Sequence, residues 1–181
     1  MKVLFFSDIH GVADNLEKLL YFIEELKPDQ VVLLGDALYH GPRNGVPESY
    51  DGPHTASLLN SLWDKIIAVR GNCDAEVDQM LINFPIMSDY AQLITPNKVF
   101  FLTHGHLWNE NNLPNLAKGS VLAHGHTHIP VLKTLDNGIT IFNPGSLSLP
   151  KGGFPKTFGF YDGEELSVRL LEDGSILKLI D

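Results

Sequence analysis

The chain has 181 residues, with 22 Asp or Glu against 13 Lys or Arg, and a formal net charge of −9. This length is typical of one domain with a substantial core. The acidic balance, without any run of basic residues, argues against a sequence-independent nucleic-acid binder, whose affinity depends on clustered Lys and Arg. An anionic substrate stays compatible with this charge, because two divalent cations would add about four positive charges at a site.

Cysteine content and apolar runs bear on the cellular compartment. Cys73 is the single cysteine, so an internal disulfide is excluded. Met1 leads into an apolar run without the charged start and long apolar stretch of a signal peptide. The apolar runs are also shorter than the roughly 20 residues of a membrane-spanning helix. We therefore expect a soluble, cytoplasmic protein with no membrane partner.

The first half of the chain alternates strand-like and helix-like segments. Apolar runs predict strands at residues 2–7, 30–34 and 66–69, and helical periodicity predicts helices at residues 13–26 and 54–63. This order indicates βαβ units with parallel strands.

The second half contains short strands separated by turns. They are expected at residues 92–95, 99–102, 121–123, 131–135, 139–142, 158–161, 166–171 and 176–180. Asp136-Asn137-Gly138 predicts a hairpin, and we expect this part of the chain to be antiparallel. Nothing divides residues 1–181, so two stacked sheets with helices outside form the economical architecture.

Metal-capable side chains follow the apolar runs, where the predicted strands end. They are Asp8, His10, Asp36, Asn72, His104, His126 and His128. In α/β sheets, ligands bind just beyond the carboxyl ends of the strands, so these residues are expected to converge. Carboxylate, imidazole and carboxamide donors suit Mn, Fe, Co, Ni or Zn better than Ca or Mg.

Seven such donors indicate a two-metal site. Asp36, preceded by Gly35, is the expected bridging carboxylate between ions about 3.5–4 Å apart. Water held between such ions loses a proton near neutral pH, and we expect this metal-bridging hydroxide to attack the substrate.

Taken singly, several of these residues have simpler interpretations. Asp8 could cap the first helix, with His10 at the surface, and Asn72 could belong to a glycine turn. Each histidine could be a hydrogen-bonded core residue. The shared position of all seven at strand ends favours metal ligation.

The motifs in their order resemble the calcineurin-like metallophosphoesterase superfamily. They are Asp8-Ile9-His10, Gly35-Asp36, Gly71-Asn72-Cys73-Asp74, Thr103-His104 and Gly125-His126-Thr127-His128. With His40-Gly41-Pro42-Arg43-Asn44 and Asn143-Pro144-Gly145-Ser146, they are similar to the small bacterial YfcE-type phosphodiesterases. Any one motif is weak, whereas the ordered set is specific.

The resemblance implies a four-layer α/β/β/α sandwich of two mixed sheets. It also implies hydrolysis of a small-molecule phosphodiester with two divalent ions, usually Mn²⁺, in a homodimer or homotetramer. The first ion would be held by Asp8, His10, Asp36 and His128. The second would be held by Asp36, Asn72, His104 and His126. No nucleic-acid partner is expected.

Cys73 departs from the family pattern. Many relatives have a histidine there that contacts phosphate and can protonate the leaving oxygen. A thiol with a pKa of about 8.5 is a poor replacement, so we expect activated diesters as substrates, and the role of Asp74 stays open. Arg43 could clamp a phosphate oxygen or be a solvated surface charge. The catalytic candidates are Asp36, Asn72, Cys73, Asp74 and Arg43.

The remaining polar and aromatic residues have looser assignments. Trp63 and Trp108 are expected in the core or at a subunit contact, Arg70 is expected to be structural, and Lys151 and Lys156 are expected at the surface. His106 and His124 could lie behind the ligands, at the surface or facing substrate.

Two other functions stay open. One is a non-catalytic binding scaffold, like the retromer subunits of the superfamily, although the full donor set including His10 weakens it. The other is a phosphomonoesterase or protein phosphatase, which would need more cationic groups for a dianionic phosphate.

Overall fold

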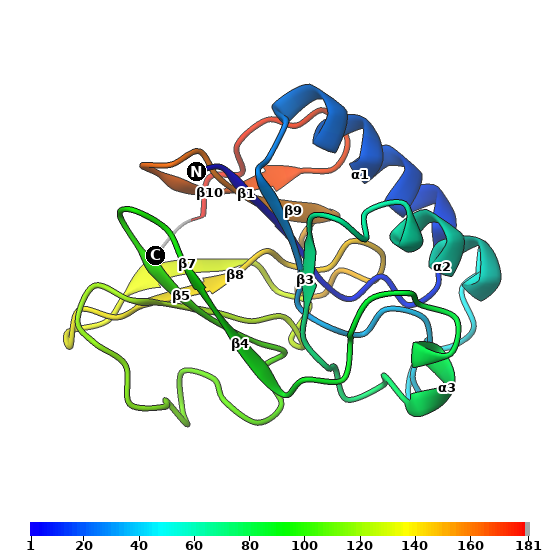
Figure 1. Cartoon of the computed structure of the whole chain (residues 1–181), viewed down its shortest axis with the longest axis horizontal. Helices are drawn as coiled ribbons and strands as arrows, with labels where there is room; N and C mark the ends of the chain where they lie inside the picture. Colours follow the sequence, from blue (N-terminus) through cyan, green and yellow to red (C-terminus); the bar gives the residue numbers. More distant parts are fainter. Residues whose placement is uncertain (180–181) are drawn as a thin grey trace.

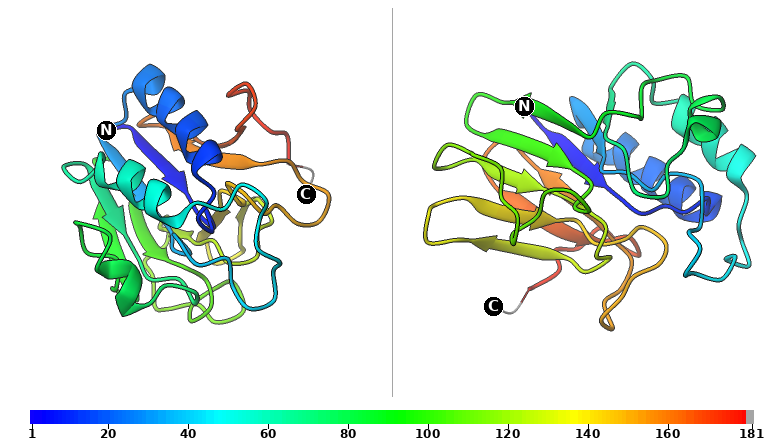
Figure 2. Two further views of the ribbon diagram at one scale, coloured as in Figure 1. Left: turned by 90° about the vertical axis from the view of Figure 1, so that its right-hand side faces the viewer. Right: turned by 90° about the horizontal axis from the view of Figure 1, so that it is seen from below.

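The computed structural model describes residues 1–179, which form two mixed five-stranded sheets packed face to face (Figures 1 and 2). The strand orders are β10-β9-β1-β2-β3 and β4-β5-β6-β8-β7. The strands are β1 (Val3–Phe6), β2 (Gln30–Leu33), β3 (Ile66–Ala68), β4 (Tyr90–Ile94), β5 (Val99–Thr103), β6 (Val121–Ala123), β7 (Val131–Thr134), β8 (Thr140–Asn143), β9 (Thr157–Tyr161) and β10 (Leu166–Leu170). The helices are α1 (Ala13–Leu26), α2 (Gly52–Asn60) and α3 (Glu76–Gln79).

Both faces of the first sheet are buried. Leu4 and Phe6 of β1 belong to the apolar cluster that includes α1 and α2, whereas Val3 and Phe5 pack between the two sheets. This alternation follows from the two-residue repeat of a strand. Burial on both faces explains why β1 is an uninterrupted apolar run.

The outer face of the second sheet is covered by an irregular segment, residues 105–119. Trp108 and Leu113 of this segment pack on Phe101 and Leu122. The segment runs along the lower edge of the molecule in Figure 1. The predicted four-layer sandwich of two mixed sheets is confirmed, and the layer over the second sheet is a loop in this molecule.

Helix α1 buries one face and ends at Lys27. Leu19 and Ile23 are buried, and Lys27 adopts a left-handed φ of 48° while its backbone N–H donates to the Ile23 carbonyl (3.0 Å). At the other end, Val12 precedes the first turn and no side chain caps it. The alternative in which Asp8 caps this helix is therefore wrong.

The centre of the second sheet is parallel, so the expectation of an antiparallel C-terminal part is wrong there. Strand β6 pairs in parallel with β5 and with β8. Residues 104–120 form a long crossover between β5 and β6, and they lack the helical periodicity that usually signals such a connection. The hairpin predicted at Asn137-Gly138 is confirmed as the antiparallel pair β7 and β8.

Helix α2 begins and ends earlier than the predicted residues 54–63. The Oδ1 atom of Asp51 accepts the backbone N–H of His54 (2.9 Å) and so fixes the start of the helix. Trp63 lies beyond its end and is 68% exposed, so the assignment of Trp63 to the core is wrong.

Two short elements also differ from expectation. Ile176 makes only a single bridge to Arg169, so the expected strand at 176–180 is not formed in the described residues, and Ile180 lies outside them. Helix α3 was not predicted, because four residues carry no periodic pattern. No helix within residues 1–179 is long and apolar enough to cross a membrane.

Candidate metal centre

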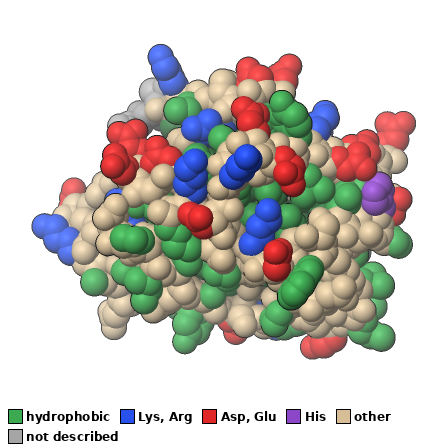
Figure 3. Space-filling view, turned by 45° about the horizontal axis from the view of Figure 1, so that its top comes forward, with side chains coloured by type: hydrophobic (Ala, Val, Ile, Leu, Met, Phe, Trp, Pro, Cys, Tyr) green, Lys and Arg blue, Asp and Glu red, His purple; other side chains and the backbone are tan. Residues whose placement is uncertain are grey.

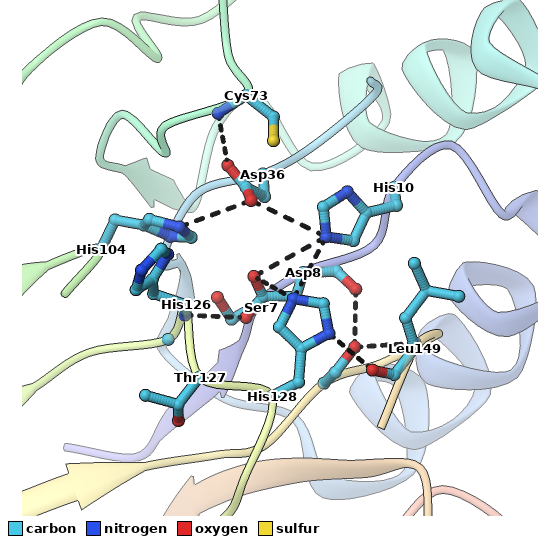
Figure 4. Close-up of polar contacts among 12 residues, drawn as sticks. Ser7, Asp8, His10, Asp36, Cys73, His104, His126, Thr127, His128 and Leu149 are labelled. Carbon is cyan, nitrogen blue, oxygen red and sulfur yellow. Dashed lines mark hydrogen bonds and ion pairs between the residues drawn. The ribbon is translucent and has the colours of Figure 1, made fainter. Parts of the chain in front are cut away.

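Loops at one end of the sandwich carry the predicted donors. Asp8 follows β1 and Asp36 follows β2, both in the first sheet, whereas His104 follows β5 and His128 follows β6 in the second. Figure 4 shows these side chains gathered around a common centre. The site thus lies where the carboxyl ends of parallel strands from both sheets meet.

The first donor group consists of Asp8, His10 and His128. The two Nε2 atoms lie 3.8 and 3.3 Å from Asp8 Oδ1 and 3.4 Å from each other (Figure 4). His10 Nδ1 donates to the Tyr39 carbonyl (2.7 Å), and His128 Nδ1 donates to the Leu149 carbonyl (2.5 Å). Because a carbonyl only accepts, each neutral ring presents the lone pair of Nε2 to its neighbours.

Asp8 adds a third acceptor to this group. Its carboxylate is fully buried, and Oδ1 has no hydrogen-bond partner among residues 1–179. Burial by itself raises the pKa of Asp8, but His128 and His104, when protonated, outweigh burial and hold that pKa below its ordinary value. Three converging acceptors with an unsatisfied oxygen fit a divalent cation.

Asp36 stands between two imidazole groups. Its Oδ2 atom lies 3.7 Å from His10 Nε2 and 3.4 Å from His104 Nε2, while Oδ1 accepts the backbone N–H of Cys73 (2.9 Å). Asn72 Oδ1 lies 3.2 Å from His104 Nε2. One oxygen of the Asp36 carboxylate therefore faces both His10 and His104, which is the position of a ligand that two metal ions could share.

His104 is fully buried, and its Nδ1 atom donates to the Leu34 carbonyl (2.7 Å). Burial lowers the pKa of His104, but the hydrogen bond to Asp36 and the charge of Asp8 raise it to about 9. The same contacts hold the pKa of Asp36 well below its ordinary range, against the effect of burial. A metal ion that binds here therefore displaces a proton.

His126 and His124 differ in environment. His126 lies beside His104, with ring centroids 5.1 Å apart, but it belongs to none of the close donor groups among the described residues, so its ligand role stays a prediction. Burial and the charge of His104 lower the pKa of His126 to about 4. His124 is a buried core residue that hydrogen-bonds the Gly125 carbonyl (3.0 Å).

The donor loops are held in an uncommon backbone conformation. Six non-glycine residues within the described chain have positive φ, and five of them are predicted ligands. These five are Asp8 (56°), His10 (52°), Asp36 (56°), His126 (69°) and His128 (61°). The left-handed region costs an ordinary residue on the order of 1 kcal/mol, and such strain concentrates at functional sites.

Glycines let two of the loops cross at close range. A Cβ atom at Gly71 would lie 2.0 Å from Asp36 Oδ1. Gly35 has a φ of 93°, and a Cβ there would lie 2.6 Å from the backbone nitrogen of Gly71. Only glycine fits at this crossing, which explains the glycine before both Asp36 and Asn72.

Asp74 joins the same two loops. Its Oδ2 atom accepts the backbone N–H groups of Asp36 (2.9 Å) and Gly71 (2.7 Å), and Oδ1 accepts that of Ala37 (2.8 Å). Burial raises the pKa of Asp74, and these hydrogen bonds oppose the rise. The contacts of Asp74 are thus those of a backbone anchor behind the donors.

The Cys73 thiol lies beside the donors. Its sulfur falls within 4.8 Å of a donor atom of His10 and of Asp36. Burial, followed by the charge of Asp36, raises the pKa of Cys73 to about 12. At neutral pH the group is a neutral thiol, a poor nucleophile and a weak proton donor.

The donors open onto a cleft of about 530 Å³, whose lining residues include Arg43 and Lys151. Lys151, expected only as a surface charge, thus borders the site. A larger cavity of about 790 Å³ between α1 and the end of β10 contains none of the predicted donors, so donor chemistry locates the site better than size. Acidic and basic side chains are interspersed on the face shown in Figure 3.

The groups that orient the imidazoles could not be predicted from the sequence. The carbonyls of Leu34, Tyr39 and Leu149 accept the three Nδ1 hydrogens, and backbone acceptors leave no signal in a sequence. Ser146 was named only within the motif Asn143-Pro144-Gly145-Ser146, without a role of its own, although its hydroxyl donates to the Asp8 carbonyl (2.9 Å). The available signal was a small polar residue three positions after a buried strand.

Two packed mixed sheets with carboxylate and imidazole donors at their strand ends are typical of metal-dependent hydrolases. The calcineurin-like phosphoesterase superfamily domain model matches residues 1–165. The chain therefore belongs to the calcineurin-like phosphoesterase superfamily.

Relatives of known name support this assignment. The chain is 48% identical over 180 residues to phosphodiesterase YfcE of Escherichia coli strain K12, covering 99% of this chain and 97% of that protein. A solved structure of the E. coli phosphoesterase YfcE superposes with a TM-score of 0.95 at 47% identity, covering 98% of this chain and 97% of the other. Vps29 of Entamoeba histolytica, solved with Zn²⁺, shares the fold at 19% identity (TM-score 0.59; 98% and 96% covered).

Proposed function

We propose that this phosphoesterase hydrolyses phosphodiesters with two divalent metal ions, with Mn²⁺ as the first candidate. The observation that carries the proposal is Asp36 Oδ2, which faces His10 Nε2 at 3.7 Å and His104 Nε2 at 3.4 Å. A shared carboxylate oxygen between two donor groups is what a dinuclear centre needs. The identity to a named phosphodiesterase supports the diester preference.

The ligand sets of the two ions share Asp36. The first ion would be held by Asp8, His10, Asp36 and His128. The second would be held by Asp36, Asn72, His104 and His126. When bound, such ions neutralise charge on the phosphate and lower the pKa of a water to near neutrality.

The chain supplies orientation and charge around this centre. The carbonyls behind His10 and His128 fix both rings with Nε2 directed inward. Arg43 and Lys151 border the cleft, where their charges can bind the non-bridging oxygens of a phosphate. Cys73 donates a proton poorly, which favours diesters with a leaving group that needs little protonation.

A matrix of metals and substrates on metal-stripped protein tests the proposal. We expect turnover of bis-p-nitrophenyl phosphate with Mn²⁺ and much slower turnover of p-nitrophenyl phosphate. A preference for the monoester would identify a phosphomonoesterase. Binding of two ions without turnover of any phosphoester would favour the scaffold function.

A further inference from the structure

The segment after β8 contacts two predicted ligands of the first ion from behind. Ser146 is fully buried, and its hydroxyl donates to the backbone carbonyl of Asp8 (2.9 Å). The same oxygen accepts the backbone N–H groups of Ser148 (3.2 Å) and Leu149 (2.8 Å). One hydroxyl therefore connects the backbone that carries Asp8 to the turn that contains Leu149.

That turn determines the orientation of His128. The Leu149 carbonyl accepts the Nδ1 hydrogen of His128 (2.5 Å; Figure 4), and the backbone N–H of Lys151 donates to the His128 carbonyl (3.1 Å). Rotation of the Leu149 peptide would remove the acceptor behind the ring. The lone pair of His128 Nε2 would then no longer be directed at Asp8 Oδ1, 3.3 Å away.

We infer that Ser146 is a positioning residue for the first metal ion: its hydroxyl sets the distance and direction between Asp8 and His128. This inference rests on the proposed dinuclear site. Ser146 is not among the residues that line the cleft, so it acts through the two ligands rather than on substrate. Groups that orient metal ligands typically change metal affinity by roughly 10–100-fold when removed.

The predicted ligands of the second ion make no hydrogen bond to this turn within residues 1–179. His104 is oriented by the Leu34 carbonyl. The Asp36 carboxylate accepts the backbone N–H of Cys73, and the backbone N–H of Asp36 donates to the Asp74 carboxylate. Removal of the Ser146 hydroxyl should therefore weaken the binding of the first ion and leave the affinity for the second ion unchanged. This asymmetry distinguishes a positioning role from a general loss of stability.

Ser148 provides a matched control on the same turn. Its side chain is also largely buried, and its hydroxyl accepts from Asn15 Nδ2 (3.2 Å) instead of contacting the Asp8 backbone. Ser148→Ala removes the same atom as Ser146→Ala, two residues away. Ser146→Cys fills the space of the side chain with a weaker donor and acceptor, and carries the test if Ser146→Ala does not fold.

The experiment titrates metal-stripped wild type, Ser146→Ala, Ser146→Cys and Ser148→Ala with Mn²⁺ by calorimetry, alongside electron paramagnetic resonance spectra. We expect two ions in the wild type and in Ser148→Ala. In Ser146→Ala, one ion should bind roughly 10–100-fold more weakly and the other as in the wild type. At limiting Mn²⁺, the electron paramagnetic resonance spectrum of the wild type should be that of a coupled pair of ions, and the spectrum of Ser146→Ala should be that of an isolated ion.

The possible failures are distinguishable. Two ions bound with wild-type affinities in Ser146→Ala, or in Ser146→Cys where the alanine variant does not fold, would overturn the role of Ser146 alone. Fewer than two ions in the wild type would overturn the dinuclear site, and this inference with it. If both ions bound equally more weakly to Ser146→Ala, the hydroxyl would contribute to general stability, and the positioning role would be wrong.

Discussion

The Nε2 atoms of His10 and His128 face each other at 3.4 Å, and both rings donate their Nδ1 hydrogens to backbone carbonyls. When both rings are neutral and Nδ1 carries the hydrogen, the lone pairs of the two Nε2 atoms face each other and repel. A cation held by these two rings and Asp8 would replace this repulsion with attraction, so metal binding and folding should be coupled.

Adding Mn²⁺ to metal-stripped protein should therefore raise the melting temperature. At 100 times Kd, one bound ion contributes about 2.7 kcal/mol, which corresponds to about 5–10 °C for a chain of this size. His10→Gln should lose most of this shift in differential scanning fluorimetry. His54→Gln, at the exposed pair of His54 with Glu17, should keep it. A shift of equal size in both variants would contradict the coupling.

Asp74→Asn should lower stability and activity together. The amide nitrogen of Asn cannot accept, so at least one backbone N–H near Asp36 loses its partner, at a cost of about 1–3 kcal/mol. Urea unfolding measures the loss. Asp89→Asn, which breaks the half-exposed pair with Arg70 (2.8 Å), should cost less than about 1 kcal/mol. Similar losses in the two variants would argue against an anchoring role.

Lys27→Gly should stabilise the protein without affecting catalysis. Lys27 is the one left-handed non-glycine residue of the described chain outside the predicted ligands, with a φ of 48°. Glycine removes the Cβ strain there and should add about 0.5–1 kcal/mol, seen in urea unfolding. Lys18→Gly, in the exposed interior of α1, should instead cost about 1 kcal/mol. A loss of stability in Lys27→Gly would show that the strain is absent.

Alkylation of Cys73 should be slow and should accelerate with pH. The thiolate is the reactive form, and the pKa of Cys73 is raised to about 12 by burial and by the charge of Asp36. Below that pKa, each pH unit increases the thiolate fraction about tenfold. Iodoacetamide labelling of metal-stripped protein, followed by mass spectrometry from pH 7 to 10, should rise throughout. A plateau near pH 9 would indicate an ordinary thiol.

Cys73→His should reduce the dependence of activity on the leaving group. An imidazole titrates near neutral pH and can protonate a departing oxygen, which the neutral thiol does poorly. The gain should be larger for alkyl than for nitrophenyl diesters in a series of leaving groups. An unchanged slope of log kcat against leaving-group pKa would refute the proposed effect of Cys73.

Much of the site could be predicted from sequence because its donors share one physical signature. Asp8, Asp36 and His104 each end an apolar strand, and parallel strands bring their carboxyl ends to one edge. The two-sheet fold followed from the same pattern together with the family resemblance. The parallel pairing of β6 could not be predicted, since residues 104–120 form its crossover without a helical repeat.

The support behind the donors was also invisible in the sequence. The carbonyls of Tyr39 and Leu149 belong to residues whose side chains do not matter for the contact. In the sequence, Asp74 cannot be distinguished from an ordinary acidic residue in a turn. Its three backbone partners come from loops about 35 residues apart in the chain. Such contacts depend on the distance between loops, which periodicity does not encode.

The crossing of Gly35 and Gly71 has a consequence for natural variation. Because a methyl group at position 71 would lie 2.0 Å from Asp36 Oδ1 and 2.3 Å from the Asp36 backbone nitrogen, even alanine should displace both the carboxylate and the loop that carries it. Variants at this position should therefore lose the Asp36 ligand together with some stability. The space needed by one carboxylate therefore limits which residues position 71 can accept.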